Sequence, residues 1–125
     1  MNITQELDLI QFPSFDLKVS IELAANDPLL AKKLCSMMLS TLEEAQKSIN
    51  LIEKSYDLEI LKEQVHKLYG GCCYTGFTRL KYICQLLEQS INLFNHQKIK
   101  QYLKLFNQEI DYLIANQNKF LEIAS

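Results

Sequence analysis

The fold of this chain is decided by the stretch LEILKEQVHKLYGGCC, residues 58–73. Its apolar residues recur at intervals of three and four, which is the spacing of one face of an α-helix. At about 100° per residue they fall within about 80° of arc on a helical wheel. The stretch therefore predicts an amphipathic helix that buries one face through Leu58, Leu61, Val65, Leu68 and Cys72.

Helix-start signals on both sides of this stretch predict further helices. Asp16 is a suitable N-cap for a short helix over about residues 16–25. Asn26-Asp27-Pro28 opens a long helix that runs to about Ser55, because Asp27 can cap free amides and Pro28 loses no hydrogen bond at the first position. After a turn at residues 74–78, where Gly76 is expected to supply a positive φ, helices follow over about residues 77–92 and 97–121.

Each of these helices has an apolar stripe that is expected to be buried. The stripes are Leu30, Leu34, Met37, Met38, Thr41, Leu42, Ala45, Ile49 and Ile52 in the long helix; Leu80, Ile83, Cys84, Leu87 and Ile91 in the next; and Ile99, Leu103, Phe106, Ile110, Leu113, Ile114 and Phe120 in the last. The expected fold class is all-α, an antiparallel four-helix bundle with an additional short N-terminal helix. Residues 1–15 are interpreted as an arm whose aromatic side chains pack on the bundle, and residues 16–125 as the bundle domain.

The composition argues against several classes of function. The 125 residues make one domain, and a net charge of -2 argues against nucleic acid as a partner. No segment reaches the roughly 18 apolar residues of a membrane span, and the first ten residues lack the basic start of a secretion signal, so no membrane contact is expected. The four cysteines are poorly spaced for a zinc site or a disulfide framework. We therefore expect no metal, and small buried thiols in a reducing cytosol.

The residue that stands out is His66, which lies roughly 120° from the centre of the buried arc and should face solvent. Its surface neighbours at helical spacing are Lys62, Glu63, Tyr69 and Gly70. A glycine inside a helix costs about 0.5–1 kcal/mol relative to alanine. One turn after an exposed imidazole, its missing side chain would clear space for a partner to approach the ring.

Gly71 is expected to extend that cleared patch, and Lys62 or Lys67 could hold an anionic group. A solvent-exposed imidazole is largely neutral at cytosolic pH, so it keeps a lone pair and can act as a nucleophile. Each feature also has an ordinary structural explanation, such as a helix C-cap for the two glycines or a solvated face for the lysines. Their coincidence around one histidine favours a phosphoryl-carrying site.

The run HKLYGGCCYTGFTRL, residues 66–80, resembles the signature of the histidine-containing phosphotransfer (HPt) family. In that pattern the histidine is followed by an apolar residue at +2, glycine at +4, glycine at +10 and an apolar residue at +14. Leu68, Gly70, Gly76 and Leu80 match all four positions. The following CQLLE, residues 84–88, is similar to the family's next helix. The stretch also resembles the C-terminal HPt domains of BarA-type hybrid sensor kinases.

The resemblance implies a function. His66 would accept a phosphoryl group from a receiver-domain aspartate of a hybrid sensor kinase and pass it to the aspartate of a response regulator. Mg²⁺ would be bound by the receiver, with no cofactor in this chain and no kinase activity of its own. The domain would be a monomer in the cytoplasm, either free-standing or as the cytoplasmic C-terminal part of a membrane-anchored sensor kinase.

The resemblance also implies where partners bind. Lys62, Lys67, Tyr69, Gly70 and Gly71 would position the phosphoryl group or the partner. Many family members have lysine at the third position after the histidine, where this chain has Tyr69, so the assisting cation stays open between Lys67 and Lys62. The receiver would dock on a surface formed by Glu63, Cys73, Tyr74 and Phe77.

One alternative is a non-catalytic helical protein-interaction module that docks a partner helix through an apolar groove. Tyr69, Tyr74 and Phe77 would then form an exposed surface that works independently of His66. A hydrolase or a di-iron protein is disfavoured, because no nucleophile–base pair and no clustered carboxylates are visible. The remaining histidine, His96, is expected to lie at a helix start as a capping or loop residue.

Overall fold

The structure, a computed structural model, describes residues 9, 11–55 and 57–124. Its elements are helices joined by short turns, with no strand in the described ranges. The helices are α2 (Leu17–Leu23), α3 (Pro28–Ser55), α4 (Leu58–Cys72), α5 (Thr78–Asn92), α6 (His96–Ala115) and α7 (Gln117–Ile123). The all-α class predicted from the sequence is confirmed.

Four of the helices begin where short polar side chains cap free backbone amides. Asp16 accepts from the amide of Val19 at 3.1 Å, and Asp27 accepts from the amide of Leu29 at 3.0 Å. Asp57 caps α4 and Asn95 caps α6 in the same way. Caps of this kind stabilise a helix by about 1 kcal/mol each, so local sequence largely determines where these helices start.

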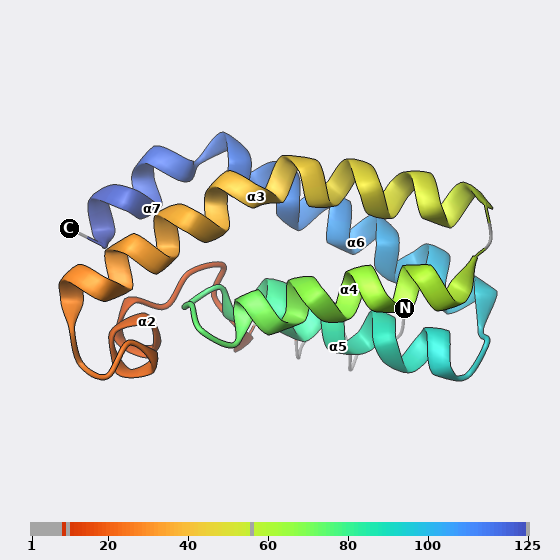
Figure 1. Ribbon diagram of the computed structural model, residues 1–125, viewed down its shortest axis with the longest axis horizontal. Helices are drawn as coiled ribbons and strands as arrows, with labels where there is room; N and C mark the ends of the chain where they lie inside the picture. The colour runs from red at the N-terminus through yellow and green to blue at the C-terminus, as the bar shows by residue number, and fades with distance from the viewer. Residues whose placement is uncertain (1–8, 10, 56, 125) are drawn as a thin grey trace.

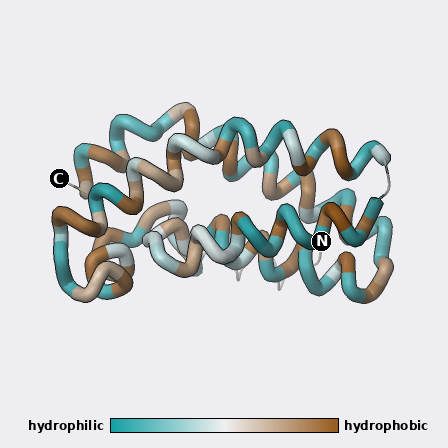
Figure 2. The backbone as a smooth tube through the Cα atoms, in the orientation of Figure 1, coloured by the Kyte–Doolittle hydropathy of each residue, from teal (hydrophilic) through white to brown (hydrophobic). Residues whose placement is uncertain are grey.

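The four long helices form an antiparallel bundle, with α2 beneath the start of α3 at one end (Figure 1). Around the bundle α3 packs on α4, α4 on α5, α5 on α6, and α6 returns to α3. Figure 2 shows hydropathy alternating along each helix, as expected where one face is buried and the other is wet. The innermost side chains include Leu42, Leu61, Val65, Leu80, Leu87, Phe106, Ile110 and Leu113. No helix in the described ranges is long and apolar enough to cross a bilayer.

The last predicted helix is in fact two. The chain leaves α6 at Asn116, whose side-chain amide donates to the carbonyl of Tyr112 at 2.8 Å. Asparagine side chains compete in this way with the backbone ladder, which favours a helix end. The short α7 that follows packs against α3, so that Phe120 is buried. The expectation of one helix over residues 97–121 is therefore wrong. The expectation that His96 lies at a helix start is confirmed, since α6 begins at that residue, and the capping residue is Asn95.

The buried face of α3 is rotated about the helix axis relative to the predicted apolar stripe. Leu30, Met37 and Thr41 were expected inside but are exposed. The predicted residues cover about 140° of a helical wheel, and these three form one edge of that arc. The buried face extends beyond the other edge to Cys35 and Leu39, because that edge faces the other helices of the bundle. One apolar edge of α3 is thus left uncovered.

The N-terminal arm docks beside the turn between α4 and α5, as far as it is described. Phe12 stacks on Tyr82 with ring centroids 4.9 Å apart. The backbone carbonyl of Phe12 accepts a hydrogen bond from Nε of Arg79, and that of Pro13 accepts one from the Thr78 hydroxyl, each 2.7 Å long. The expectation that the arm's aromatics pack on the bundle is confirmed for Phe12 and Phe15, while residues 1–8 lie outside the described ranges.

Gly76 has a different role from the one expected. No glycine in the described ranges has a positive φ, so the predicted left-handed turn is wrong. A Cβ at Gly76 would lie 2.3 Å from the carbonyl oxygen of Asp16. The Asp16 amide also donates to the Gly76 carbonyl at 2.8 Å. The glycine is needed because the backbone entering α2 passes directly against it.

Candidate functional site

His66 stands on the solvent face of α4, as predicted, with 69% of its side chain exposed. The Nδ1 atom of its ring lies 2.7 Å from Oε1 of Glu88 on α5. Only 19% of the Glu88 side chain is exposed, so the carboxylate is held between the two helices. The imidazole is therefore anchored at one nitrogen while the ring as a whole stays accessible.

This contact determines which nitrogen is free. An ionised carboxylate only accepts hydrogen bonds, so Nδ1 of His66 must carry the proton that is donated to Glu88. In the neutral ring the other nitrogen, Nε2, then has the lone pair. A hydrogen bond from one ring nitrogen to a carboxylate fixes both the tautomer and the orientation of a histidine. The arrangement presents Nε2 as a nucleophile.

Tyr69 forms a wall beside the imidazole, and α5 holds that wall in place. The rings of His66 and Tyr69 have centroids 6.0 Å apart. Gln85 donates to the Tyr69 hydroxyl at 3.3 Å, and the ammonium of Lys81 lies 6.0 Å from the Tyr69 ring centroid. Lys81, Gln85 and Glu88 form a polar row on α5, which we call the α5 row.

Gly70 and Gly71 are adjacent but face different surroundings. A Cβ at Gly70 would meet nothing within 4 Å, which supports the cleared approach expected one turn after His66. A Cβ at Gly71 would lie 3.0 Å from the sulfur of Met38 on α3. Gly71 therefore lets α3 approach α4, and the expectation that it extends the clearing is not met.

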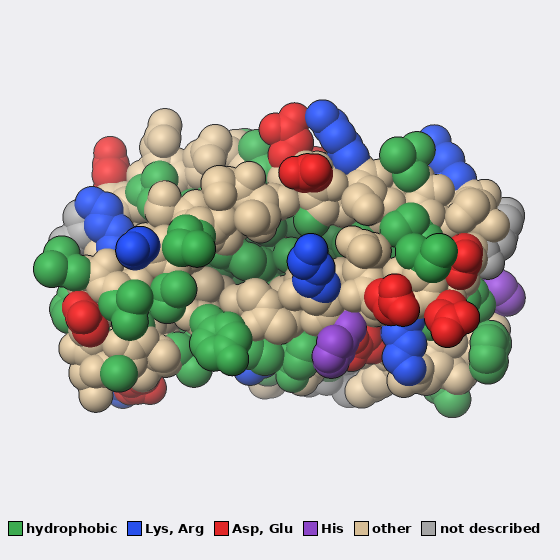
Figure 3. Space-filling model, in the orientation of Figure 1, with side chains coloured by type: hydrophobic (Ala, Val, Ile, Leu, Met, Phe, Trp, Pro, Cys, Tyr) green, Lys and Arg blue, Asp and Glu red, His purple; other side chains and the backbone are tan. Residues whose placement is uncertain are grey.

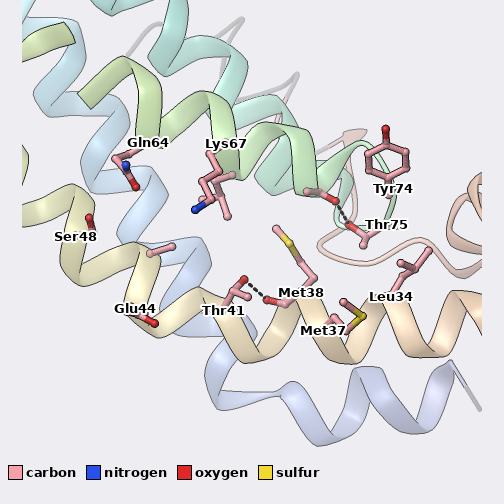
Figure 4. A pocket seen from close by; sticks show the side chains of 13 residues that line it. Leu34, Met37, Met38, Thr41, Glu44, Ser48, Gln64, Lys67, Tyr74 and Thr75 are labelled. Carbon is pink, nitrogen blue, oxygen red and sulfur yellow. Dashed lines mark hydrogen bonds between the residues drawn. The ribbon is translucent and has the colours of Figure 1, made fainter. Parts of the chain in front are cut away.

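The predicted cations lie on different sides of the histidine. Lys62 is exposed one turn before His66 on α4. Lys67 extends from α4 into a groove beside α3, as the close-up in Figure 4 shows. Lys81, over the Tyr69 ring, is a third cation near the site that sequence reasoning did not single out.

The expected docking surface is brought together only in part. Glu63 and Tyr74 are exposed and Cys73 is half-buried, so these three are accessible. Phe77 is 0% exposed, and its ring lies 5.2 Å from Phe15 and 6.3 Å from Phe120. Its place in a docking surface is therefore wrong. The arm and α7, distant segments of the chain, cover it.

The buried cysteines do not add a second nucleophile to the site. Cys35, Cys72 and Cys84 are buried and all four thiols are free. A hydrogen bond with Cys72, together with burial, raises the pKa of the Cys84 thiol well above its usual range. Burial raises the pKa of Cys35 to about 11. Thiols in this state are inert as nucleophiles, which agrees with the expectation that they serve as small core residues.

Sequence reasoning missed the α5 row as part of the site. A signal was present, because Lys81, Gln85 and Glu88 recur at four and three residues and so share one helix face. Such a polar face is usually a solvated one. Only the packing of α5 on α4 shows that it faces His66 and Tyr69.

Comparisons with known proteins agree with this geometry. Residues 30–117 match the family model described as Hpt domain. The protein BarA of Escherichia coli (strain K12), described as a signal transduction histidine-protein kinase, is 32% identical over 78 residues, 62% of this chain and 8% of that protein. The sensor protein GacS of Pseudomonas syringae pv. syringae is 30% identical over 73 residues, 58% of this chain and 8% of that protein. The chain thus matches only a small part of these relatives' length.

A solved structure supports the same fold. The crystal structure of the HPT domain of a hybrid sensor histidine kinase from Shewanella superposes with a TM-score of 0.77 at 19% identity. The superposition covers 87% of this chain and 94% of that one. At this identity the likeness concerns the bundle architecture.

Proposed function

The chain belongs to the Hpt domain family, and from this premise we propose that His66 is the residue that carries the phosphoryl group. Members of the family are histidine carriers of phosphorelays in two-component signalling. The observation that carries the assignment is the 2.7 Å contact between Nδ1 of His66 and Glu88, which leaves Nε2 free and exposed. The other histidine, His96, is the exposed first residue of α6, and its ring forms no ion pair with a carboxylate among the described residues.

In the proposed phosphoryl transfer, bonds and charges balance without loss of a proton from the imidazole ring. The Nε2 lone pair attacks the phosphorus of an aspartyl phosphate on the partner, an N–P bond forms, and the P–O bond to the aspartate breaks. The aspartate leaves as a carboxylate, and the imidazole, which keeps its Nδ1 proton, gains a positive charge. Glu88 lies where that charge develops, so its carboxylate stabilises the product ring and the transition state that leads to it.

The same contact serves the reverse step. When the N–P bond of the cationic phosphoimidazole breaks, the ring leaves as neutral imidazole, which is a good leaving group. A P–O bond to a second aspartate can therefore form when another receiver domain docks. Positioning and charge neutralisation supply most of the catalysis in such transfers. The divalent ion and the acceptor carboxylate would come from the partner, while this chain supplies the oriented nucleophile.

Glu88→Gln is expected to slow transfer from a phosphorylated receiver roughly tenfold, since a charge-assisted hydrogen bond is replaced by a neutral one worth about 1.4 kcal/mol less. The glutamine amide can also donate to Nδ1, which would place the ring proton on Nε2 and remove the nucleophilic lone pair. Quench-flow transfer assays measure the rate, and ¹⁵N NMR of the imidazole measures the tautomer.

Glu59→Gln is the matched control, because Glu59 is an exposed carboxylate two turns before His66 on the same helix. It should leave the tautomer and the rate unchanged. If the ¹⁵N shifts of the Glu88→Gln variant still report a single Nδ1–H tautomer and its rate equals that of the control, the positioning role of Glu88 is refuted.

Gly70→Gln is expected to fold normally and to slow transfer from a receiver about 10–100-fold, because small misplacements at a reacting centre have effects of this size. A Cβ at Gly70 meets nothing, so the added side chain is free to lie over the neighbouring imidazole. Phosphoramidate, a small phosphodonor that needs no docked protein, should label the variant nearly normally. Equal receiver-dependent rates for the variant and the unmodified chain would disprove the clearance argument.

We further propose the finer points that the family resemblance implies. The donor is the receiver domain of a hybrid sensor kinase, the acceptor is a response regulator, and the domain acts as a monomer in the cytoplasm. The cation that contacts the phosphoryl group is one of Lys62, Lys67 and Lys81, and single lysine-to-methionine variants assayed for phosphohistidine lifetime distinguish them.

A further inference from the structure

The ring of Tyr69 is the aromatic neighbour of the His66 imidazole. The two ring centroids lie 6.0 Å apart, and the ring planes are inclined by 34°, which is closer to parallel stacking than to an edge-on contact. A side chain three residues after a histidine lies on the same helix face and leans back over the preceding turn. A contact between rings engages neither nitrogen of the imidazole, so Nε2 stays available for the phosphoryl group.

Tyr69 is held in this position at both ends of its side chain. Its ring is half-buried and packs against the hydrophobic core. Its hydroxyl accepts a hydrogen bond from Gln85 of α5 at 3.3 Å. This contact and the one between His66 and Glu88 form two rungs between α4 and α5, three residues apart on each helix. Tyr69 therefore loses little further freedom when it interacts with a change of charge on the imidazole.

The Tyr69 ring is also accessible to positive charge. The face of an aromatic ring has a negative potential, and a cation within about 6 Å of the ring centroid is attracted to it. The ammonium of Lys81 lies 6.0 Å from the Tyr69 centroid, and the His66 ring lies at the same distance. The ring therefore has two neighbours that can be cationic, and only the lysine is charged at all times.

His66 becomes the second cation when it carries a phosphoryl group. In the transfer argued above, the N–P bond forms at Nε2, the P–O bond to the aspartate breaks, and Nδ1 keeps its proton, so the ring gains one positive charge. Glu88 meets that charge at the Nδ1 edge of the ring. Figure 3 shows a histidine exposed on the surface between hydrophobic and acidic side chains. An aromatic ring beside the imidazole adds a second interaction with the same charge, at a different part of the ring.

We propose that the ring of Tyr69 stabilises the cationic imidazole of phosphorylated His66. The proposal rests on the phosphorelay function argued above and adds no bond-making step to it. Tyr69 acts on the imidazole and not on the phosphoryl group, so it raises the population of the phosphorylated state at equilibrium. A cation–π contact at an exposed site changes an equilibrium constant by a factor of about two to five.

The test is the equilibrium constant for phosphoryl transfer onto His66, measured with Tyr69→Leu. The probe is the purified receiver domain, chosen from a panel, that loads the unmodified chain fastest, and the constant is the ratio of forward to reverse kcat/KM. Tyr69→Leu removes the aromatic ring but keeps an apolar side chain, and it should lower the constant about two- to fivefold. The equilibrium between separate proteins does not depend on how tightly they dock, so a residue that serves only docking would leave it unchanged.

Further variants locate the origin of the effect. Tyr69→Phe keeps the aromatic ring and loses only the hydroxyl, so its equilibrium constant should stay within about twofold of the unmodified one. Tyr112→Leu is the matched control, because Tyr112 is a 42% exposed tyrosine of α6 whose ring lies 6.1 Å from that of Phe120. It should change nothing. Circular dichroism should show intact helices in each variant, and Tyr69→Met, also non-aromatic, replaces the leucine variant if that one does not fold.

Protonation gives a readout that needs no phosphate, because a proton on Nε2 gives the imidazole the same positive charge. At about pH 6 the ratio of protonated to neutral His66, from ¹⁵N shifts, should fall about two- to fivefold in Tyr69→Leu and stay unchanged in Tyr112→Leu. If Tyr69→Leu equals the unmodified chain in either measurement, the proposal is wrong. Equal losses in Tyr69→Leu and Tyr69→Phe would assign the effect to the hydroxyl and also overturn it. Absence of phosphate on His66 with every donor would instead refute the proposed function, while the protonation ratio would still test the role of Tyr69.

Discussion

Replacing His66 with glutamine is expected to lower phosphate uptake from a phosphorylated receiver about a thousandfold or more, because removal of the nucleophile in a covalent mechanism abolishes the step that it performs. The change should leave the fold intact, since the side chain is 69% exposed and its contact with Glu88 is at the surface. Phos-tag electrophoresis at neutral pH or radiolabel transfer measures the uptake. The phosphate on the unmodified chain should be labile in acid and stable in base.

His96→Gln is the natural control for this experiment. His96 is the only other histidine in the sequence, and it is the exposed first residue of α6. Its variant should take up phosphate at the unmodified rate. Normal uptake by His66→Gln, or phosphate mapped to His96 by mass spectrometry, would contradict the assignment.

Gly76→Ala is expected to destabilise the fold by about 1–3 kcal/mol, the usual cost of forcing an extra methyl group into a filled space. The new Cβ would lie 2.3 Å from the Asp16 carbonyl oxygen and 2.9 Å from Cβ of Ser20. The first contact is with backbone, which cannot rotate away. The variant must therefore shift the start of α2 or the turn before α5. Urea unfolding followed by circular dichroism measures the loss of free energy.

Gly70→Ala is the comparison variant, and its expected effect on stability has the opposite sign. Its Cβ would meet nothing within 4 Å and its φ is not positive, so the change should stabilise α4 by about 0.5–1 kcal/mol through helix propensity. Two glycines of the same motif would then respond to one methyl group in opposite directions. If Gly76→Ala unfolds at the same urea concentration as the unmodified chain, the close approach of the Asp16 carbonyl does not explain this glycine.

The two variants also show how far a motif can be interpreted from sequence. The spacing of Gly70 and Gly76 after His66 was enough to indicate a family. The physical reason for Gly70 was foreseen, because it depends only on helical geometry within α4. The reason for Gly76 was not foreseen, because it depends on a backbone segment sixty residues earlier in the chain.

The wrong predictions for Phe77 and Met37 have the same cause, because the exposure of both residues depends on segments that are distant in the sequence. Phe77 directly follows the turn after α4 in the sequence, yet Phe15 and Phe120 from opposite ends of the chain bury it. Met37 fits a buried stripe, yet the neighbouring helices cover the other edge of α3. Periodicity identifies the apolar face of a helix, but not how much of that face its neighbours cover.

Local sequence was enough to predict the helical class, most of the helix starts and the exposed position of His66. These features follow from contacts between residues a few positions apart, such as the Asp27 cap and the 3.6-residue period of α4. Only the tertiary structure decided that Glu88 meets Nδ1 of His66, that Phe77 is covered and that the groove beside α3 stays open. These features depend on which helices pack side by side and at what rotation, which no local spacing records.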